Sequence, residues 1–304
     1  MHPHAYRRIT LAALVALCAI VVTGAAVRLT GSGLGCPDWP TCERGRLVAP
    51  MEYHAMVEFV NRTVTGVVSV AVALAVLGSL AQSPRRRDLV VLSLGLVAGV
   101  GAQIVLGGLT VLFELSPPFV MAHFLLSMVL LADAAVLHRR AGEPAGPRRP
   151  VVARELVAMT RIVVAAAAVV LVTGTVVTAA GPHGGDEDVE RLGFLVPDVA
   201  RVHGAAVVLL IVLILLTLWR LHRDHAPPTV RRAGEIFLAV LAGQAAVGYV
   251  QYFTGVPELL VAVHVGGAVA VWLAALHLTL IVQAPDPAPT PAPPRAVMVD
   301  ASPG

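Results

Sequence analysis

The sequence predicts an all-α integral membrane protein with eight transmembrane helices in two tandem four-helix bundles. Composition indicates the membrane class: 57% of the 304 residues are hydrophobic, 13% are charged, and the mean hydropathy is +0.80. A repeated pattern of glutamine, glycine and histidine indicates the duplication. It occurs as Gln103, Gly107 and His123 and again, 141 residues later with the same spacings, as Gln244, Gly248 and His264.

Eight apolar segments are close to the ~20 residues that a helix needs to cross a bilayer. They cover residues 10–29, 56–81, 89–113, 118–137, 158–180, 200–221, 235–253 and 258–282. The first four fall in an N-terminal repeat, 1–141, and the last four in a C-terminal repeat, 142–283. An even number of crossings gives both repeats the same topology, related by a pseudo-twofold axis along the membrane normal.

The ends of the segments carry further signals. The first is longer than the usual apolar region of a signal peptide, and Thr23-Gly24 near its end recurs as Thr173-Gly174 in the fifth. We therefore expect the first helix to be retained. Prolines mark the starts of segments four, six and eight, and the Pro- and Ala-rich residues 284–304 read as a disordered cytoplasmic tail.

The basic residues set the orientation. All 22 are arginines, and most lie before the first segment or in the connections after segments two, four and six. The positive-inside rule places these connections and both termini in the cytoplasm, with the chain in the cell membrane. The pI near 9.1 reflects this bias and does not indicate nucleic-acid binding.

Three histidines share one depth in the membrane. His123, His203 and His264 lie six or seven residues after the proline of their segment, about 9–10 Å into the helix. A single buried histidine is usually hydrogen-bonded to a neighbouring helix, but three at matched depth favour a cofactor. Facing imidazoles on neighbouring helices bind haem iron, which makes His203 and His264 the expected pair of the second repeat.

The first repeat lacks the matching imidazole. Subtracting 141 to 142 from His203 gives Asn61 or Arg62. Segment two also carries His54 and Glu58, on the same helix face as Asn61. Glu58 is expected to act as an acid, a base or a substrate-orienting carboxylate; the alternative is an ion pair with Arg62 or Arg28.

Two cysteines lie in the long loop between the first two segments, on the oxidising side of the membrane. Cys36 and Cys42 enclose five residues, and a disulfide between them is expected. Their spacing does not distinguish a structural bond from a redox-active one. Cys18 lies within the first segment and is expected to be inert packing.

These residues together resemble the haem A synthase family over essentially the whole chain apart from the tail. The resemblance rests on residues 23–40, on Glu58-Phe59-x-x-Arg62, on the Gln-to-His repeats and on His203. It implies oxidation of the ring methyl of haem O to a formyl group, through an alcohol. It also implies contact with haem O synthase and with cytochrome oxidase assembly, and leaves the electron donor open.

The resemblance assigns roles to individual positions. It implies a haem b cofactor, with its iron, between His203 and His264, and the substrate haem in the N-terminal repeat near His123. Glu58 matches the family's essential carboxylate, and Cys36 and Cys42 match the first-loop cysteine pair of bacterial members.

Two departures from the family pattern are visible. The family carries a histidine three residues after the glutamate, where this chain has Asn61, and some members have a second cysteine pair where residues 181–199 have none. His54 is a poor substitute for the missing ligand, because seven residues displace it ~10 Å along the helix. His123 alone would leave one axial position of a substrate haem open.

Three rival functions are weaker. A non-catalytic or quinone-linked b-type membrane cytochrome would need the histidine pair but not Glu58. A membrane disulfide oxidoreductase using Cys36 and Cys42 usually has a closer C-x-x-C pair and does not need three buried histidines. A transporter would explain the duplication but not the ligand geometry.

Overall fold

The computed structural model describes residues 1–186 and 188–286, and in this part of the chain it contains eight helices that are long and apolar enough to cross a membrane. The eight predicted segments are therefore confirmed. The helices are α1 (Pro3–Leu29), α2 (Tyr53–Leu80), α3 (Arg87–Leu112), α4 (Pro117–Ala141), α5 (Arg154–Ala180), α6 (Val196–Arg223), α7 (Pro228–Phe253) and α8 (Glu258–Ile281).

The starts of the helices follow local chemistry. Helix α1 begins seven residues before the predicted apolar segment, because the side chain of His2 accepts a hydrogen bond from the backbone N–H of His4 and Pro3 occupies the first position. Pro117 is the first residue of α4, Pro197 is the second of α6, and Pro257 directly precedes α8. The expected proline at the start of each of these helices is confirmed.

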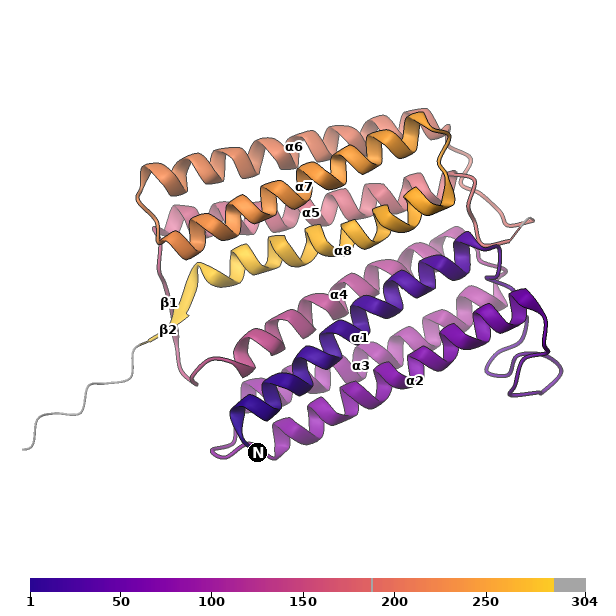
Figure 1. Ribbon diagram of the computed structural model, residues 1–304, viewed down its shortest axis with the longest axis horizontal. Coiled ribbons are helices and arrows are strands. Elements are labelled where there is room, and N and C mark those ends of the chain that lie inside the picture. The colour runs from indigo at the N-terminus through magenta and orange to yellow at the C-terminus, as the bar shows by residue number, and fades with distance from the viewer. Residues whose placement is uncertain (187, 287–304) are drawn as a thin grey trace, which may run out of the picture.

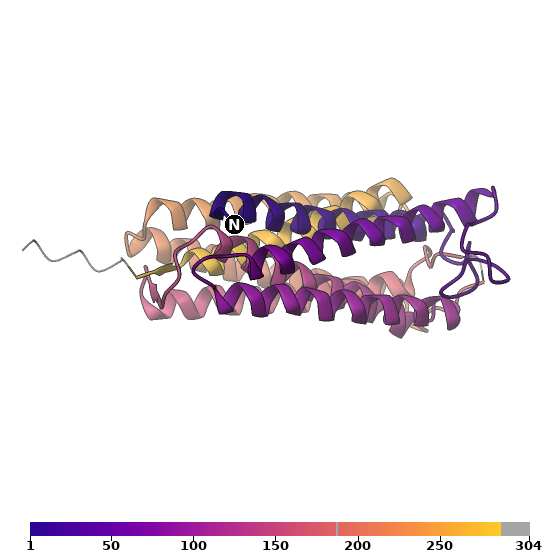
Figure 2. The same cartoon turned by 90° about the horizontal axis from the view of Figure 1, so that it is seen from below.

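Helices α1–α4 form one group and α5–α8 a second, side by side, as Figure 1 shows. All eight run along the same long axis (Figure 2). Contacts between the groups involve α8 with α1 and α4, and α4 with α5. At the α4–α8 contact the buried indole Nε1 of Trp272 donates to the backbone oxygen of Met128 at 2.8 Å. The pseudo-twofold relation between the groups stays a prediction.

The described structure includes residues 284–286, the first three residues of the predicted tail. Strand β2 (Gln283–Pro285) pairs antiparallel with β1 (Arg148–Pro150) in the α4–α5 connection. An ion pair of 2.6 Å between Arg149 and Asp286 and a backbone bond from Asp286 to Pro147 extend this pairing. These contacts hold the first residues of the predicted tail, and residues 287–304 lie outside the described part of the chain.

The two ends of the bundle differ in packing. At the end that carries the N-terminus, Tyr6 and Phe237 are fully buried, and a Cβ on Gly78 would lie 2.7 Å from the ring of Tyr6. The opposite end carries the long α1–α2 and α5–α6 loops (Figure 1), and cavities form there between helices and loops. Open space suited to a ligand therefore lies towards the loop end.

Candidate functional site

Each of the three membrane histidines packs against a glycine on the preceding helix. A Cβ on Gly107 of α3 would lie 3.3 Å from Cε1 of His123 on α4. The same distance is 3.2 Å between Gly174 of α5 and His203, and 3.0 Å between Gly248 of α7 and His264; these are closer than ordinary van der Waals contact. The absent side chain of each glycine is therefore what admits the imidazole ring between the two helices.

The glutamines of the repeated pattern hold the same histidines through their backbone. Gln103 Nε2 donates to the carbonyl oxygen of His123 at 3.0 Å, and Gln244 Nε2 donates to that of His264 at 2.7 Å. A partly buried hydrogen bond across a helix pair restricts the rotation and register of the helix that carries the histidine. The spacing that is repeated within the chain thus corresponds to one arrangement that positions a histidine and that occurs in both helix groups.

A second contact, from a threonine to a residue on the next helix, also occurs in both helix groups, but its partner is a histidine in one group and an asparagine in the other. Thr173 Oγ1 of α5 lies 3.1 Å from Nδ1 of His203 on α6, and Thr23 Oγ1 of α1 donates to Oδ1 of Asn61 on α2 at 2.8 Å. Of the two positions that the repeat offset allows, Asn61 rather than Arg62 makes the equivalent contact. The four helix pairs therefore present three imidazoles and one carboxamide.

The imidazoles keep a nitrogen available. In the part of the chain that the structure describes, Nδ1 of His123 and of His264 is buried without a hydrogen-bond partner, whereas Nδ1 of His203 contacts Thr173. No hydrogen bond among the described residues uses Nε2 of these three histidines. The described residues contain no group of three or more His, Cys, Asp or Glu that could hold a bare metal ion. A haem iron, which takes at most two ligands from the protein, fits this donor set.

Glu58 and Arg62 form the centre of a polar cluster under the α1–α2 loop. Glu58 is 6% exposed; its Oε2 accepts from the backbone N–H of Cys36 at 2.7 Å, and its Oε1 accepts from Arg62 Nη2 at 2.5 Å. Arg62 also donates to the backbone oxygens of Cys36, Asp38 and Thr41. Of the two partners expected for Glu58, Arg62 is correct and Arg28 is not, because Arg28 instead donates to the carbonyl oxygen of His183 at 2.6 Å.

The loop carries the expected disulfide between Cys36 and Cys42. Trp39, between the two cysteines, lies under the guanidinium of Arg62, 5.1 Å from the ring centroid. Its indole also packs on Gly108 of α3, where a Cβ would lie 2.6 Å from Trp39 Nε1. Trp39 thus holds the disulfide loop against the loop end of α3, one residue along that helix from Gly107, the glycine that contacts His123.

His54 stands apart from Asn61. Its Nδ1 lies 3.0 Å from the hydroxyl of Ser32 in the loop, and a Cβ on Gly35 would collide with the His54 backbone oxygen at 2.2 Å. His54 therefore positions the loop on the start of α2. His54, Glu58 and Asn61 all face α1 and its following loop, as expected from their spacing, but each binds a different partner there.

An apolar cavity of about 470 Å³ lies between α1 and α2. Asn61 and Thr23 line it, together with mainly aliphatic side chains such as Val57 and Val60. This cavity lies in the first helix group, at the position that in the second group belongs to His203. The threonines had a sequence signal in the repeated Thr-Gly pair. Trp39 lies within residues 23–40, which carry the family resemblance, but its contacts with Arg62 and Gly108 were not predicted.

Comparison with known proteins identifies the family of this chain. The model of a family described as cytochrome oxidase assembly protein (COX15-CtaA) matches residues 7–54 and 48–182. A protein of Shouchella clausii named haem A synthase is 27% identical over 245 residues, which is 75% of this chain and 80% of the relative. A haem A synthase of Listeria welshimeri is 26% identical over 260 residues, 80% of this chain and 84% of the relative.

One further relative matches more strongly over a shorter stretch. The haem A synthase of Geobacillus thermodenitrificans is 35% identical over 108 residues, 34% of this chain and 32% of its own length. The family model covers the first four helices and α5, and the longer alignments extend over three quarters or more of the chain.

Proposed function

Because this chain belongs to the COX15-CtaA family of cytochrome oxidase assembly proteins, we propose that it is a haem A synthase that oxidises the ring methyl of haem O to a formyl group. One observation carries the proposal beyond the family name: the four equivalent helix pairs present three imidazoles and one asparagine. A duplicated frame that served only for electron transfer would be expected to keep two equal ligand pairs. Two helix groups with different ligand residues suit one resident cofactor and one substrate.

The second helix group would hold the cofactor, a haem b, between His203 of α6 and His264 of α8. Thr173 holds the ring of His203 and Gln244 the backbone of His264, so both ligands are positioned by contacts across their own helix pair. A haem bound there supplies one-electron redox chemistry, with a potential set by its axial ligands and their surroundings.

The first helix group would receive haem O, between His123 of α4 and Asn61 of α2. A carboxamide oxygen is a weaker iron ligand than an imidazole, so Asn61 leaves one axial side of the substrate iron free for a small molecule. The apolar cavity between α1 and α2 offers room for the hydrophobic part of such a substrate. The ring methyl would be oxidised in two two-electron stages, first to an alcohol and then to the formyl group, with an external electron acceptor taking the electrons and the oxygen atom coming from water or dioxygen.

Glu58 has two proposed roles. Its contacts favour a positioning role, because both oxygens accept hydrogen bonds that anchor the disulfide loop over the site. The acid–base role expected from the sequence requires that the carboxyl release Arg62 or Cys36 during turnover. In either case the charge of Glu58 is needed, and neither role needs a redox change at Cys36 and Cys42.

The direct test is haem analysis after expression in a bacterial host that makes haem O but not haem A. Haems extracted from the membranes are separated by chromatography, with the empty vector and His123→Ala as controls. Haem A should appear only with the intact chain. Protein that carries haem b but leaves haem O unchanged would instead identify a b-type cytochrome. Haem-independent oxidation of added thiols would identify a disulfide oxidoreductase.

The proposal also implies interaction partners for the protein. The substrate must come from an enzyme that makes haem O, and the product serves cytochrome oxidase, so contact with both is proposed. The electron donor or acceptor is unassigned. With both termini in the cytoplasm, as the arginines predict, the disulfide loop and the open end of the bundle would lie on the outer side of the cell membrane.

A further inference from the structure

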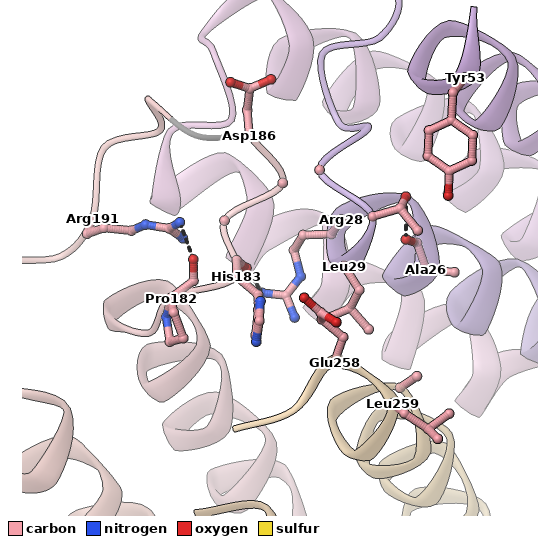
Figure 3. A pocket seen from close by; sticks show the side chains of 15 residues that line it. Ala26, Arg28, Leu29, Tyr53, Pro182, His183, Asp186, Arg191, Glu258 and Leu259 are labelled. Carbon is pink, nitrogen blue, oxygen red and sulfur yellow. Dashed lines mark hydrogen bonds between the residues drawn. The ribbon is translucent and has the colours of Figure 1, made fainter. Parts of the chain in front are cut away.

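A charged cavity of about 650 Å³ lies at the loop end of the bundle, where the two helix groups meet (Figure 3). Its walls come from the end of α1, the start of α2, the α5–α6 loop and the start of α8. Two guanidinium groups line it, those of Arg28 and Arg191. Nothing proposed so far for the protein uses either arginine.

Both arginines have unused capacity to bind an anion. Arg28 Nη1 donates to His183 O, and Arg191 Nη2 donates to Pro182 O, each at 2.6 Å (Figure 3). A guanidinium has five N–H donors, and among the described residues neither arginine forms an ion pair. The carboxylates of Asp186 and Glu258 line the same cavity without pairing with either of them.

The two positive charges also disfavour each other. Arg28 and Arg191 are near enough for their like charges to interact, and burial lowers the pKa of the Arg191 guanidinium below its ordinary value. Partly buried like charges that form no ion pair are costly, and the carboxylates of Asp186 and Glu258 line the cavity without forming one with either arginine. An anion between them would remove that cost and use the free donors. A planar fork of donors favours a carboxylate or a phosphate.

The charged cavity adjoins the apolar cavity of the first helix group. Ala26 and Tyr53 line both. Thr23, which binds Asn61 in the apolar cavity, lies five residues before Arg28, about 7.5 Å along α1. The arrangement is that of a binding site for an amphiphile, with its apolar part beside Asn61 and its anionic part at the loop end.

The geometry of α8 separates this cavity from the second histidine pair. The cavity is lined by Glu258, Leu259 and Ala262 of α8. At 100° per residue these lie about 120–160° around the helix from His264. On the cavity side α8 approaches α1, where a Cβ on Gly266 would lie 3.9 Å from Val22. The anion site therefore belongs with an occupant of the first helix group.

We infer that Arg28, assisted by Arg191, anchors the propionate carboxylates of the haem substrate while the macrocycle lies beside Asn61, next to the adjoining apolar cavity. This inference rests on the proposed function, since it requires that a haem enter the first group. The same donors would accept the phosphate of a lipid headgroup, and the experiment separates the two sources. In this role Arg28 is a substrate-binding residue that also fixes the α5–α6 loop through His183.

The test is equilibrium binding of iron protoporphyrin IX and of its dimethyl ester to the purified full-length protein in detergent, followed by absorbance. The ester keeps the macrocycle and loses both carboxylates. Wild type should bind the free acid at least about tenfold more tightly than the ester, which is about 1.4 kcal/mol. Arg28→Gln should remove that preference by weakening the free acid alone, Arg28→Lys should restore part of it, and Arg191→Gln should show a smaller loss.

Arg201→Gln is the matched control, because Arg201 is an exposed arginine near the same end of the bundle, with its side chain 79% accessible. It should leave both affinities unchanged. Equal binding of acid and ester by wild type, or equal weakening of both by Arg28→Gln, would reduce Arg28 to a structural contact. Competition by a short-chain phosphatidylglycerol against wild-type binding of the acid but not the ester would assign the cavity to lipid phosphate and overturn the inference.

The same experiment distinguishes failure of the proposed function. If wild type binds neither porphyrin, the haem-based function itself fails. If wild type binds porphyrin and makes haem A but shows no preference for the acid, only the anchor is wrong. Should Arg28→Gln not fold, the Arg191→Gln measurement decides.

Discussion

Replacing Gly248 by alanine should displace the imidazole of His264 and weaken binding of the haem that we propose for the second helix group. The new Cβ would lie 3.0 Å from Cε1 and 3.5 Å from Nδ1 of His264. A methyl group at this distance forces the ring or the α7–α8 spacing to shift by a few tenths of an ångström. Gly243→Ala is the matched control, since it lies in the same helix with no heavy atom within 4 Å of its Cβ position.

The two substitutions share one contribution to the free energy of unfolding and differ in another. Both replace glycine by alanine within α7, a change that favours a helix by up to about 1 kcal/mol. Only Gly248→Ala adds overpacking, which typically costs about 1–3 kcal/mol. If that strain is relieved by moving the ring away from the iron, haem affinity should fall roughly tenfold for each 1.4 kcal/mol.

The assay is the haem-to-protein ratio and the absorbance spectrum of each purified variant, with thermal unfolding followed by circular dichroism. Gly248→Ala should lose much of the low-spin haem while staying folded, and Gly243→Ala should match wild type or melt slightly higher. Equal haem content in the two variants would refute the reasoning that the glycine is present to admit the ligand. Equal loss in both would mean that any added methyl on α7 disturbs the site.

The other predictions concern the first helix group and its loop. Asn61→His should place an imidazole against Thr23 as His203 lies against Thr173, giving a second low-spin bis-histidine spectrum and slower haem A formation; an unchanged spectrum would contradict the equivalence of the two positions. Glu58→Gln should keep the second-group haem, lose about 1.5–3 kcal/mol of charged hydrogen bonding and abolish haem A formation; normal haem A yield in extracts would leave the ion pair without a functional role. Changing Cys36 and Cys42 together to serine should lower haem A yield while the second-group haem stays bound, and thiol labelling of oxidised wild type should reach only Cys18. Labelling of all three cysteines in fresh membranes would contradict the disulfide.

The membrane spans and the repeated pattern could be predicted because both depend only on residues close together in the sequence. Hydropathy alone locates eight helices, and the identical spacing of Gln103 to His123 and of Gln244 to His264 marks the repeat. The reason for that spacing could not be predicted. The glutamine binds a backbone carbonyl twenty residues away, and the glycine clears space for a ring on the next helix, so both contacts exist only once the helices pair.

Contacts between distant segments could not be predicted from the sequence either. Arg62 was one of two candidate partners for Glu58, and only the packing of the loop shows that it also binds three loop carbonyls. Strand β2 pairs with the α4–α5 connection more than 130 residues earlier in the chain, in a segment whose composition alone suggested disorder. The Arg28 cavity needs four segments drawn from both helix groups, and no sequence pattern joins them.

The two helix groups share their arrangement of helices and differ in their ligand residues at a small number of positions. Thr23 and Thr173 make the same kind of contact, so the threonine remains where the histidine has become asparagine. The change at residue 61 is accompanied by further features of the first helix group: the Glu58–Arg62 pair, the disulfide loop seated on α3, and the apolar cavity between α1 and α2. A ligand site that needed only to hold a cofactor would gain nothing from losing an imidazole. A site that must admit, orient and release a haem gains an open axial position, a covering loop and an anchor for the carboxylates.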